Sequence, residues 1–279
     1  MIQFGLRLHD AEKLPLPEQL RTVREQGFAC VHLALSKIQG LTADPAALTP
    51  GYAMYLKRIF ADAGLDIAVL GNYLNLATPD EAALKANQEK YRAHLRFASL
   101  LGAGVVGTET GNPNTGYQYD PETSHSDEAL ETFIKNLRPV VNDAERFGVI
   151  LAIEPVWRHI VYSPERARTV LDEISSPNLQ IIFDPVNLLD ESNADTREEV
   201  FETAMNLLEK EIAVIHLKDF KAETGVTSCM AAGLGDMDYR SILRFAKEKK
   251  PFIHATLENT RPENAQQALE YLRQLEASL

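Results

Sequence analysis

The sequence predicts an α/β protein, a single (β/α)8 TIM barrel with parallel strands that occupies residues 1–279 as one domain. Eight short apolar runs recur along the chain, and each is followed by a segment with helical periodicity. Eight strands are enough to close a barrel. The length of 279 residues is also close to the ~250 residues typical of this architecture, and no linker or break in composition divides the chain.

The elements alternate from one end of the chain to the other. The expected strands are residues 2–9, 28–35, 66–74, 105–110, 149–154, 179–184, 212–218 and 252–258. The expected helices are residues 17–26, 50–63, 79–101, 127–147, 164–174, 196–209, 239–249 and 262–275. Capping residues precede proline at three helix starts, namely Thr49, Thr78 and Ser163. Glycine marks four transitions from helix to strand, at Gly27, Gly64, Gly102 and Gly148.

The alternative fold is an open, doubly wound sheet. That fold normally carries a glycine-rich phosphate loop after its first strand, whereas here the first strand ends in Leu8-His9-Asp10. Two strand-to-helix loops are long, at residues 111–126 and 221–238. In a barrel, long loops at this position place the functional face at the carboxyl ends of the strands.

Composition narrows the possible partners. A net charge of -12 argues against nucleic acid, and no run of 18 apolar residues predicts a membrane span. The first residues read as a strand without a basic leader, so we expect a cytoplasmic protein. Cys30 and Cys229 lie too far apart in sequence to suggest a disulfide framework or a thiolate metal site. The expected partner is a small molecule, and a homo-oligomer is compatible with the sequence.

Four consecutive strands end in a potential metal ligand. The apolar run Ile181-Ile182-Phe183 stops at Asp184 and Pro185, and the neighbouring strands end in Glu154, His216 and Glu258. Each residue alone fits a turn cap, a salt-bridge partner or a satisfied histidine. Together, three carboxylates at one opening would repel one another unless a cation held them. One imidazole among carboxylates suits Mn²⁺, Mg²⁺ or Co²⁺, with Zn²⁺ as a further option.

These strand ends resemble the xylose isomerase-like TIM barrels, and within them the sugar phosphate isomerase/epimerase group. That group includes ketose 3-epimerases, inosose dehydratases and hydroxypyruvate isomerases. The resemblance covers essentially the whole chain and rests on Ile153-Glu154-Pro155, Phe183-Asp184-Pro185-Val186-Asn187, His216-Leu217-Lys218-Asp219, Gly233-Leu234-Gly235-Asp236-Met237-Asp238-Tyr239 and Leu257-Glu258-Asn259. It implies that Glu154, Asp184, His216 and Glu258 bind a divalent metal. It also implies that Glu154 and Glu258 flank the substrate carbon and move its proton.

The sequence departs from the family pattern at several positions. Asn187 stands where many relatives have histidine, which predicts a neutral hydrogen bond to a substrate hydroxyl. Ile160 replaces a glutamate that is common in the epimerases, and His32 replaces the glutamate common at the end of the second strand. Glu109 is an additional acid at the mouth, which either caps a turn or takes part in acid–base chemistry.

The expected reaction is proton abstraction next to a carbonyl of a small sugar, keto-sugar or polyol, phosphorylated or not. Returning the proton to the other face gives epimerisation, and moving it to the neighbouring carbon gives isomerisation. Loss of a β-hydroxyl from the same intermediate would make the protein a dehydratase. Lys218 either neutralises a developing oxyanion or pairs with Asp219 or another nearby acid. The other expected substrate contacts are Arg7, His9, Trp157 and Arg158.

Two further functions share this barrel. One is an endonuclease IV-like DNA repair enzyme, which uses a histidine-rich multi-metal cluster. This chain has Asn187 and Glu109 where further histidines would be expected, and its acidity disfavours DNA. The other is a non-catalytic sugar-binding barrel, which retention of all four candidate ligands disfavours.

Overall fold

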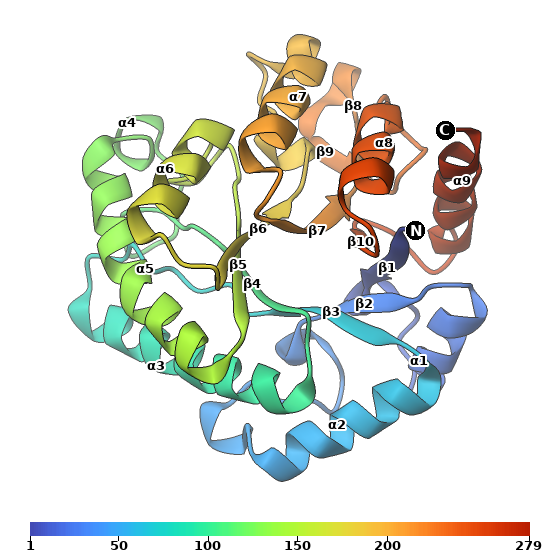
Figure 1. The fold of residues 1–279 in the computed structure, drawn as a ribbon, viewed down its shortest axis with the longest axis horizontal. Coiled ribbons are helices and arrows are strands. Elements are labelled where there is room, and N and C mark those ends of the chain that lie inside the picture. Colours follow the sequence, from blue (N-terminus) through green and yellow to red (C-terminus); the bar gives the residue numbers. More distant parts are fainter.

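The computed structural model describes the backbone of residues 1–279 and every side chain except those of Thr224, Val226 and Thr227. Within this described chain, eight parallel strands close into a barrel in the order β1-β10-β7-β6-β5-β4-β3-β2, surrounded by helices (Figure 1). The strands are β1 Gln3–Arg7, β2 Cys30–Leu33, β3 Asp66–Gly71, β4 Val105–Glu109, β5 Ile150–Glu154, β6 Leu179–Phe183, β7 Ile212–Leu217 and β10 His254–Leu257. The predicted (β/α)8 barrel is confirmed.

The helices follow the predicted alternation closely. They are α1 Leu16–Glu25, α2 Pro50–Ala63, α3 Glu81–Leu101, α4 Pro121–Ser124, α5 Asp127–Phe147, α6 Pro164–Ile174, α7 Arg197–Leu208, α8 Arg240–Lys249 and α9 Ala265–Ser278. Short 3-10 turns occupy Leu8–Asp10, Leu35–Lys37, Pro45–Ala47, Val186–Leu188, Ala194–Thr196 and Ala222–Thr224. Among the described residues, no helix is both long enough and apolar enough to cross a membrane. The cytoplasmic location stays a prediction.

Hydrogen bonds to the first turns fix where the helices begin. The Thr49 and Ser163 side chains accept backbone N–H bonds at the starts of α2 and α6, as the sequence predicts. The prediction for α3 was wrong, because Asp80 rather than Thr78 caps this helix. The Asp80 carboxylate accepts two backbone N–H bonds of the first turn and lies nearest the positive end of the helix dipole.

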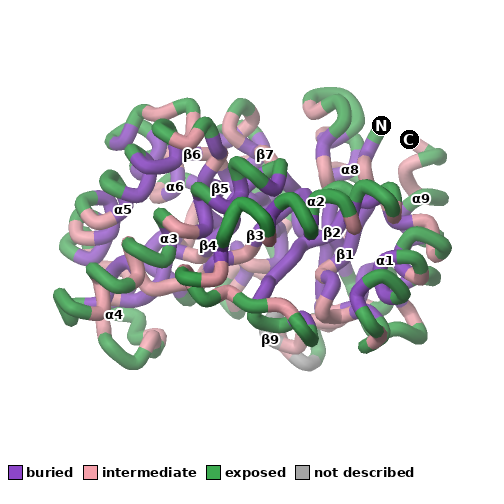
Figure 2. Tube along the Cα trace, turned by 90° about the horizontal axis from the view of Figure 1, so that it is seen from below, coloured by how far each residue is buried: buried purple, intermediate pink, exposed green. Residues whose placement is uncertain are grey.

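The apolar core has two parts. Small and β-branched side chains fill the barrel interior, from Cys30, Ala68, Val69, Val105, Ala152, Ile182 and Val214. A larger cluster joins the outer face of the strands to the surrounding helices. Figure 2 shows the buried strands at the centre and the exposed outer faces of the helices. Because side chains alternate along a strand, the residues above the filled interior point into the open end of the barrel.

The loop at residues 221–238 is more ordered than the sequence suggested. After β7, the short strand β8 Asp219–Lys221 pairs antiparallel with β9 Gly225–Met230, and neither strand was predicted from the sequence. In Figure 2, β9 and α4 lie at the same end of the barrel. Both belong to the long strand-to-helix loops, so these loops build up the face at which the strands end.

The buried side chain of Asp219 holds the backbone of this loop by hydrogen bonds. Its side chain is fully buried and its two oxygens accept three backbone N–H bonds, from Phe220, Gly233 and Met237. A Cβ atom on Gly235 would collide with the Asp219 carboxylate and with the Phe220 carbonyl. The Gly233-Leu234-Gly235-Asp236 motif therefore wraps the chain around one carboxylate, which fixes the backbone next to Lys218.

Candidate metal centre and active-site cavity

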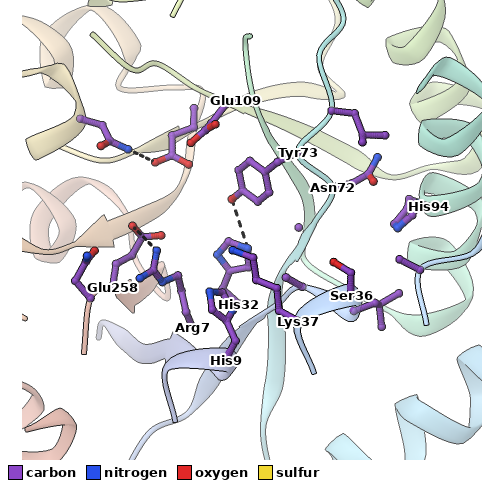
Figure 3. Close-up of a pocket in the computed structure, with 18 of the residues that line it drawn as sticks. Arg7, His9, His32, Ser36, Lys37, Asn72, Tyr73, His94, Glu109 and Glu258 are labelled. Carbon is purple, nitrogen blue, oxygen red and sulfur yellow. Dashed lines mark hydrogen bonds and ion pairs between the residues drawn. The ribbon is translucent and has the colours of Figure 1, made fainter. Parts of the chain in front are cut away.

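A cavity of about 670 Å³ opens at the carboxyl ends of the strands. Residues at the ends of β1, β2, β3, β4, β5, β7 and β10 line it, together with Asn187 from the turn after β6 (Figure 3). Its volume lies in the range of pockets that bind small molecules. The cavity lies on the face where the long strand-to-helix loops in the sequence predicted the functional site.

Glu154, Asp184 and His216 meet beneath this cavity, and of the three only Glu154 lines it. One potential ligand atom from each lies within 4.8 Å of the others, and all three residues are buried. Glu258 joins them through His216, whose Nδ1 lies 3.2 Å from Glu258 Oε1 and 3.4 Å from Glu154 Oε1. Register explains the convergence, because each residue ends an inward-facing row of its strand. The structure thus brings all four predicted ligands together.

The donor set fits a divalent metal ion. Carboxylate oxygens with one imidazole suit an oxygen-preferring ion such as Mn²⁺ or Mg²⁺. Neither ring nitrogen of the fully buried His216 has hydrogen-bond geometry with any described residue. Buried polar atoms rarely lack a hydrogen-bond partner, so an imidazole whose neighbours are carboxylates is suited to bind a cation together with them.

Lys218 lies inside the same carboxylate cluster. Its Nζ is 2.8 Å from Asp184 Oδ2 and 3.4 Å from Glu258 Oε2, and it donates a hydrogen bond of 2.7 Å to Asn187 Oδ1. The sequence left the acid partner open, and the structure pairs Lys218 with Asp184 rather than with Asp219. Lys218 also lines the cavity, so the same ammonium is in position to approach a bound substrate.

Burial and mutual charge shift the pKa values in this cluster. Burial raises the pKa of Asp184 to about 6, with Lys218 opposing the shift and Glu258 adding to it. Burial acts against His216 protonation, but the carboxylates of Glu258 and Glu154 raise the pKa of His216 to about 9. For Glu258, burial is outweighed by His216, Lys218 and Arg7, which hold its pKa well below the ordinary range. The cluster therefore strongly attracts positive charge.

Asn187 orients two members of the cluster. Its Nδ2 donates a hydrogen bond of 2.7 Å to Glu154 Oε1, while its Oδ1 accepts from Lys218. Its backbone N–H donates to Asp184 Oδ1 at 3.1 Å, as expected for a turn that follows an aspartate. Asn187 lines the cavity, so the neutral hydrogen-bonding role predicted for it is compatible with its position.

Arg7, at the end of β1, and His9, in the 3-10 turn that follows, approach the cluster. Arg7 Nε donates to Asp10 Oδ2 at 2.8 Å, and Arg7 Nη1 lies 3.4 Å from Glu258 Oε2. Burial, together with the charges of Arg7 and Lys37, lowers the pKa of His9 to about 4. His9 is therefore neutral near pH 7, and both side chains line the cavity.

Glu109 forms a separate acidic position at the end of β4. The Tyr117 hydroxyl donates to Glu109 Oε2 at 3.2 Å, and His159 Nε2 lies 3.9 Å from the same oxygen. Burial and the charge of Glu154 raise the pKa of Glu109 to about 7. A carboxyl group with this pKa can donate or accept a proton near neutrality.

The two expected contacts after β5 differ in position. Arg158 lines the cavity. Trp157 does not lie among the lining residues in the described structure, and its ring packs edge-on against Tyr119 at 5.2 Å between ring centroids.

Two further residues belong to the site. The sequence singled out His32 only as a departure from the family pattern, without a role in the site, and Tyr73 was not predicted. The His32 ring stacks on His216 at 5.4 Å between centroids and on Tyr73 at 5.7 Å. His32 Nε2 lies 3.4 Å from the Tyr73 hydroxyl (Figure 3). A side chain at Gly71 would collide with His32, so this glycine makes room for the stack. His32 also has a ring nitrogen within 4.8 Å of ligand atoms of His216 and Glu258. Its place at a strand end was the signal available in the sequence.

Comparison with known proteins supports this architecture. The xylose isomerase-like TIM barrel family matches residues 20–275. No curated protein sequence matches the chain significantly. Solved structures with the same fold include 3-keto-D-glucoside 4-epimerase from E. coli, with 16% identity and a TM-score of 0.77 over 98% of this chain and 100% of that one.

Two further structures show the same arrangement. A D-tagatose 3-epimerase-like protein has 21% identity and a TM-score of 0.77, over 99% of this chain and 97% of its own. A probable 3-DHS dehydratase from Bacillus anthracis has 14% identity and a TM-score of 0.73, over 99% of each chain.

Proposed function

The chain belongs to the xylose isomerase-like TIM barrel family, and from that premise we propose that it is a divalent-metal-dependent isomerase or epimerase. Its substrate is a small sugar, keto-sugar or polyol, and the reaction moves a proton next to a carbonyl. The observation that carries the proposal is the buried cluster of Glu154, Asp184, His216 and Glu258 at the base of an open cavity. The epimerase and dehydratase names of similar folds agree with this class of chemistry.

Glu154, Asp184, His216 and Glu258 would hold the metal ion, with Mn²⁺, Mg²⁺ or Co²⁺ favoured by the oxygen-rich donor set. When bound, such an ion polarises a carbonyl and stabilises the negative charge that forms when a neighbouring C–H loses its proton. Lys218 would stabilise the same charge, because its ammonium already lies among the carboxylates and faces the cavity.

Glu154 and Glu258 would transfer the proton. They approach His216 from strands that are separated by β6 and β7 in the barrel, so they can address a substrate from two sides. The low pKa of Glu258 keeps its carboxylate ionised, which is the form that binds a metal ion. Asn187 holds the Glu154 carboxylate in position through Oε1. Return of the proton to the opposite face gives epimerisation, and transfer to the adjacent carbon gives isomerisation.

Deuterium exchange tests the proposal whichever product the reaction forms. The Mn²⁺-loaded protein is incubated with a panel of ketoses and aldoses in D2O, and incorporation at carbon is followed by NMR. We expect exchange with at least one sugar, and a loss of roughly 10²–10⁴-fold in Glu154→Gln and Glu258→Gln. Glu122→Gln, on the exposed helix α4, should match the wild type. Absence of exchange from the whole panel, or equal exchange in all variants, would contradict the proposal.

A metal-dependent dehydratase is the second candidate, and Glu109 is the observation that favours it. Its raised pKa and its position on the cavity wall suit an acid that protonates a leaving hydroxyl. In the same NMR experiment a dehydratase would give an unsaturated product with loss of water, whereas an epimerase would give an isomer of unchanged mass. Glu109→Gln should slow only the dehydration.

A further inference from the structure

The charges around the cavity are unevenly distributed. The carboxylates of Glu154 and Glu258 lie deep and buried, whereas the exposed residues that line the mouth include three cations, Lys37, Lys90 and Arg158. Among the described side chains, none of these three charged groups forms a salt bridge or a hydrogen bond. Since the chain carries a net charge of -12, a positive mouth is not an average property of its surface.

The buried carboxylates are neutralised without the lysines at the cavity mouth. The cluster and its neighbour Asp10 hold four carboxylates, those of Glu154, Asp184, Glu258 and Asp10. Lys218 and Arg7 offset two of these charges, and the divalent ion of the proposed function would offset the other two. Glu109 is the remaining acid on the cavity wall, and its carboxylate contacts Tyr117 and His159 rather than a lysine. The positive charge of Lys37 and Lys90 is therefore available to a ligand.

The side chain of Asn72 carries an unused hydrogen-bond donor in the cavity wall. Asn72 is only 7% exposed and lines the cavity, and its Nδ2 has no hydrogen-bond partner among the described residues. Burying an amide N–H donor without an acceptor costs free energy. A ligand oxygen would supply the acceptor that Asn72 lacks. Ser36 and His94 line the wall beside it.

The residues around the candidate metal centre and the residues around Asn72 lie on opposite sides of the cavity. Figure 3 places Glu258 and Arg7 on one side of Tyr73, and Asn72, His94 and Ser36 on the other. Lys37 comes from the turn after β2 and extends toward His9 and His32, between the two sets (Figure 3). Lys90 is on α3, one turn before His94, whose Nδ1 bonds to the Lys90 carbonyl.

We propose that the substrate carries an anionic group, a phosphate or a carboxylate, at the end away from its reacting carbon, and that Lys37, Lys90 and the Asn72 amide bind this group. The proposal rests on the proposed function and specifies the substrate class for the same cavity. Phosphate and carboxylate oxygens are the acceptors that ammonium and amide N–H groups bind best.

Binding calorimetry with three probes of similar size tests this assignment. D-fructose 6-phosphate, D-fructuronate and D-fructose are titrated into the Mn²⁺-loaded protein and into the metal-free protein. We expect one of the anionic probes to bind about tenfold more tightly than fructose, with the preferred probe identifying the group as phosphate or carboxylate. The preference should shrink as the salt concentration rises, because the two lysines are exposed.

Substitutions locate the site. Lys37→Gln, Lys90→Gln and Asn72→Leu should each reduce the preference for the anionic probe, and the double lysine variant should abolish it. Lys85→Gln, an exposed lysine on the same helix α3, should keep it. Equal binding of all three probes, no binding of any, or an unchanged preference in the double variant would overturn the assignment. Binding is measured without turnover, so these results are independent of the deuterium exchange that tests catalysis.

Discussion

Replacing Lys218 by methionine should destabilise the metal-free protein strongly. The Lys218 ammonium is 5% exposed and is the nearest cation to Asp184, at 2.8 Å, and a close one to Glu258, at 3.4 Å. Methionine fills a similar volume but removes the ammonium that pairs with Asp184 and one of the cations that pair with Glu258. Breaking a buried ion pair from one side typically costs about 3–5 kcal/mol. We expect that loss in the free energy of unfolding when a chelator is present.

A divalent ion should restore much of the loss. Because the ion would supply positive charge to the same carboxylates, saturating Mn²⁺ should narrow the difference between Lys218→Met and the wild type. Urea unfolding followed by circular dichroism, with chelator and then with Mn²⁺, measures both effects. The matched control is Lys37→Met, an exposed lysine that should change stability by no more than about 0.5 kcal/mol. A Lys218→Met variant as stable as the wild type in chelator would refute the charge balance inferred for the cluster.

Three further results are expected. Gly235→Ala should lower the free energy of unfolding by about 2–3 kcal/mol, since its Cβ collides with Asp219 and Phe220; Gly51→Ala, with open space around its Cβ, should be neutral or slightly stabilising in urea unfolding, and equal values would contradict the steric account. The folded-state pKa of Glu109 is raised to about 7, so its ionisation lowers the stability of the wild type as the pH rises from about 4.5 through 7. The free energy of unfolding of Glu109→Gln should therefore rise by about 2–3 kcal/mol relative to that of the wild type between pH 5 and pH 8. A difference that stays constant with pH would argue against the raised pKa. Asn187→Ala should slow deuterium exchange by roughly 10–100-fold, because Glu154 loses the donor that orients it; an unchanged rate would remove Asn187 from the site.

The barrel could be predicted because its signals are local. Each strand is a short apolar run and each helix carries its own caps, so α2, α5 and α6 were placed with their observed bounds. The convergence of Glu154, Asp184, His216 and Glu258 follows from the same regularity, since parallel strands in a barrel end on one face.

Features that depend on contacts between distant residues were harder to predict. The β8–β9 hairpin forms around the buried carboxylate of Asp219, which accepts N–H groups up to 18 residues away. The stack of His32 on His216 and Tyr73 joins β2, β7 and the segment after β3, and its geometry depends on the space left by Gly71. The ion pair between Lys218 and Asp184 is likewise a tertiary contact, for which the sequence offered several acids.

The metal content of the purified protein tests the candidate centre most directly. Elemental mass spectrometry of the wild type should find about one divalent ion per chain, bound by the carboxylate and imidazole donors. Asp184→Ala should lose the ion, whereas Asp195→Ala, which removes an exposed aspartate, should retain it. If the wild type binds no ion even after Mn²⁺ or Mg²⁺ is supplied, the ligand assignment fails and the reaction proposed for this cavity fails with it.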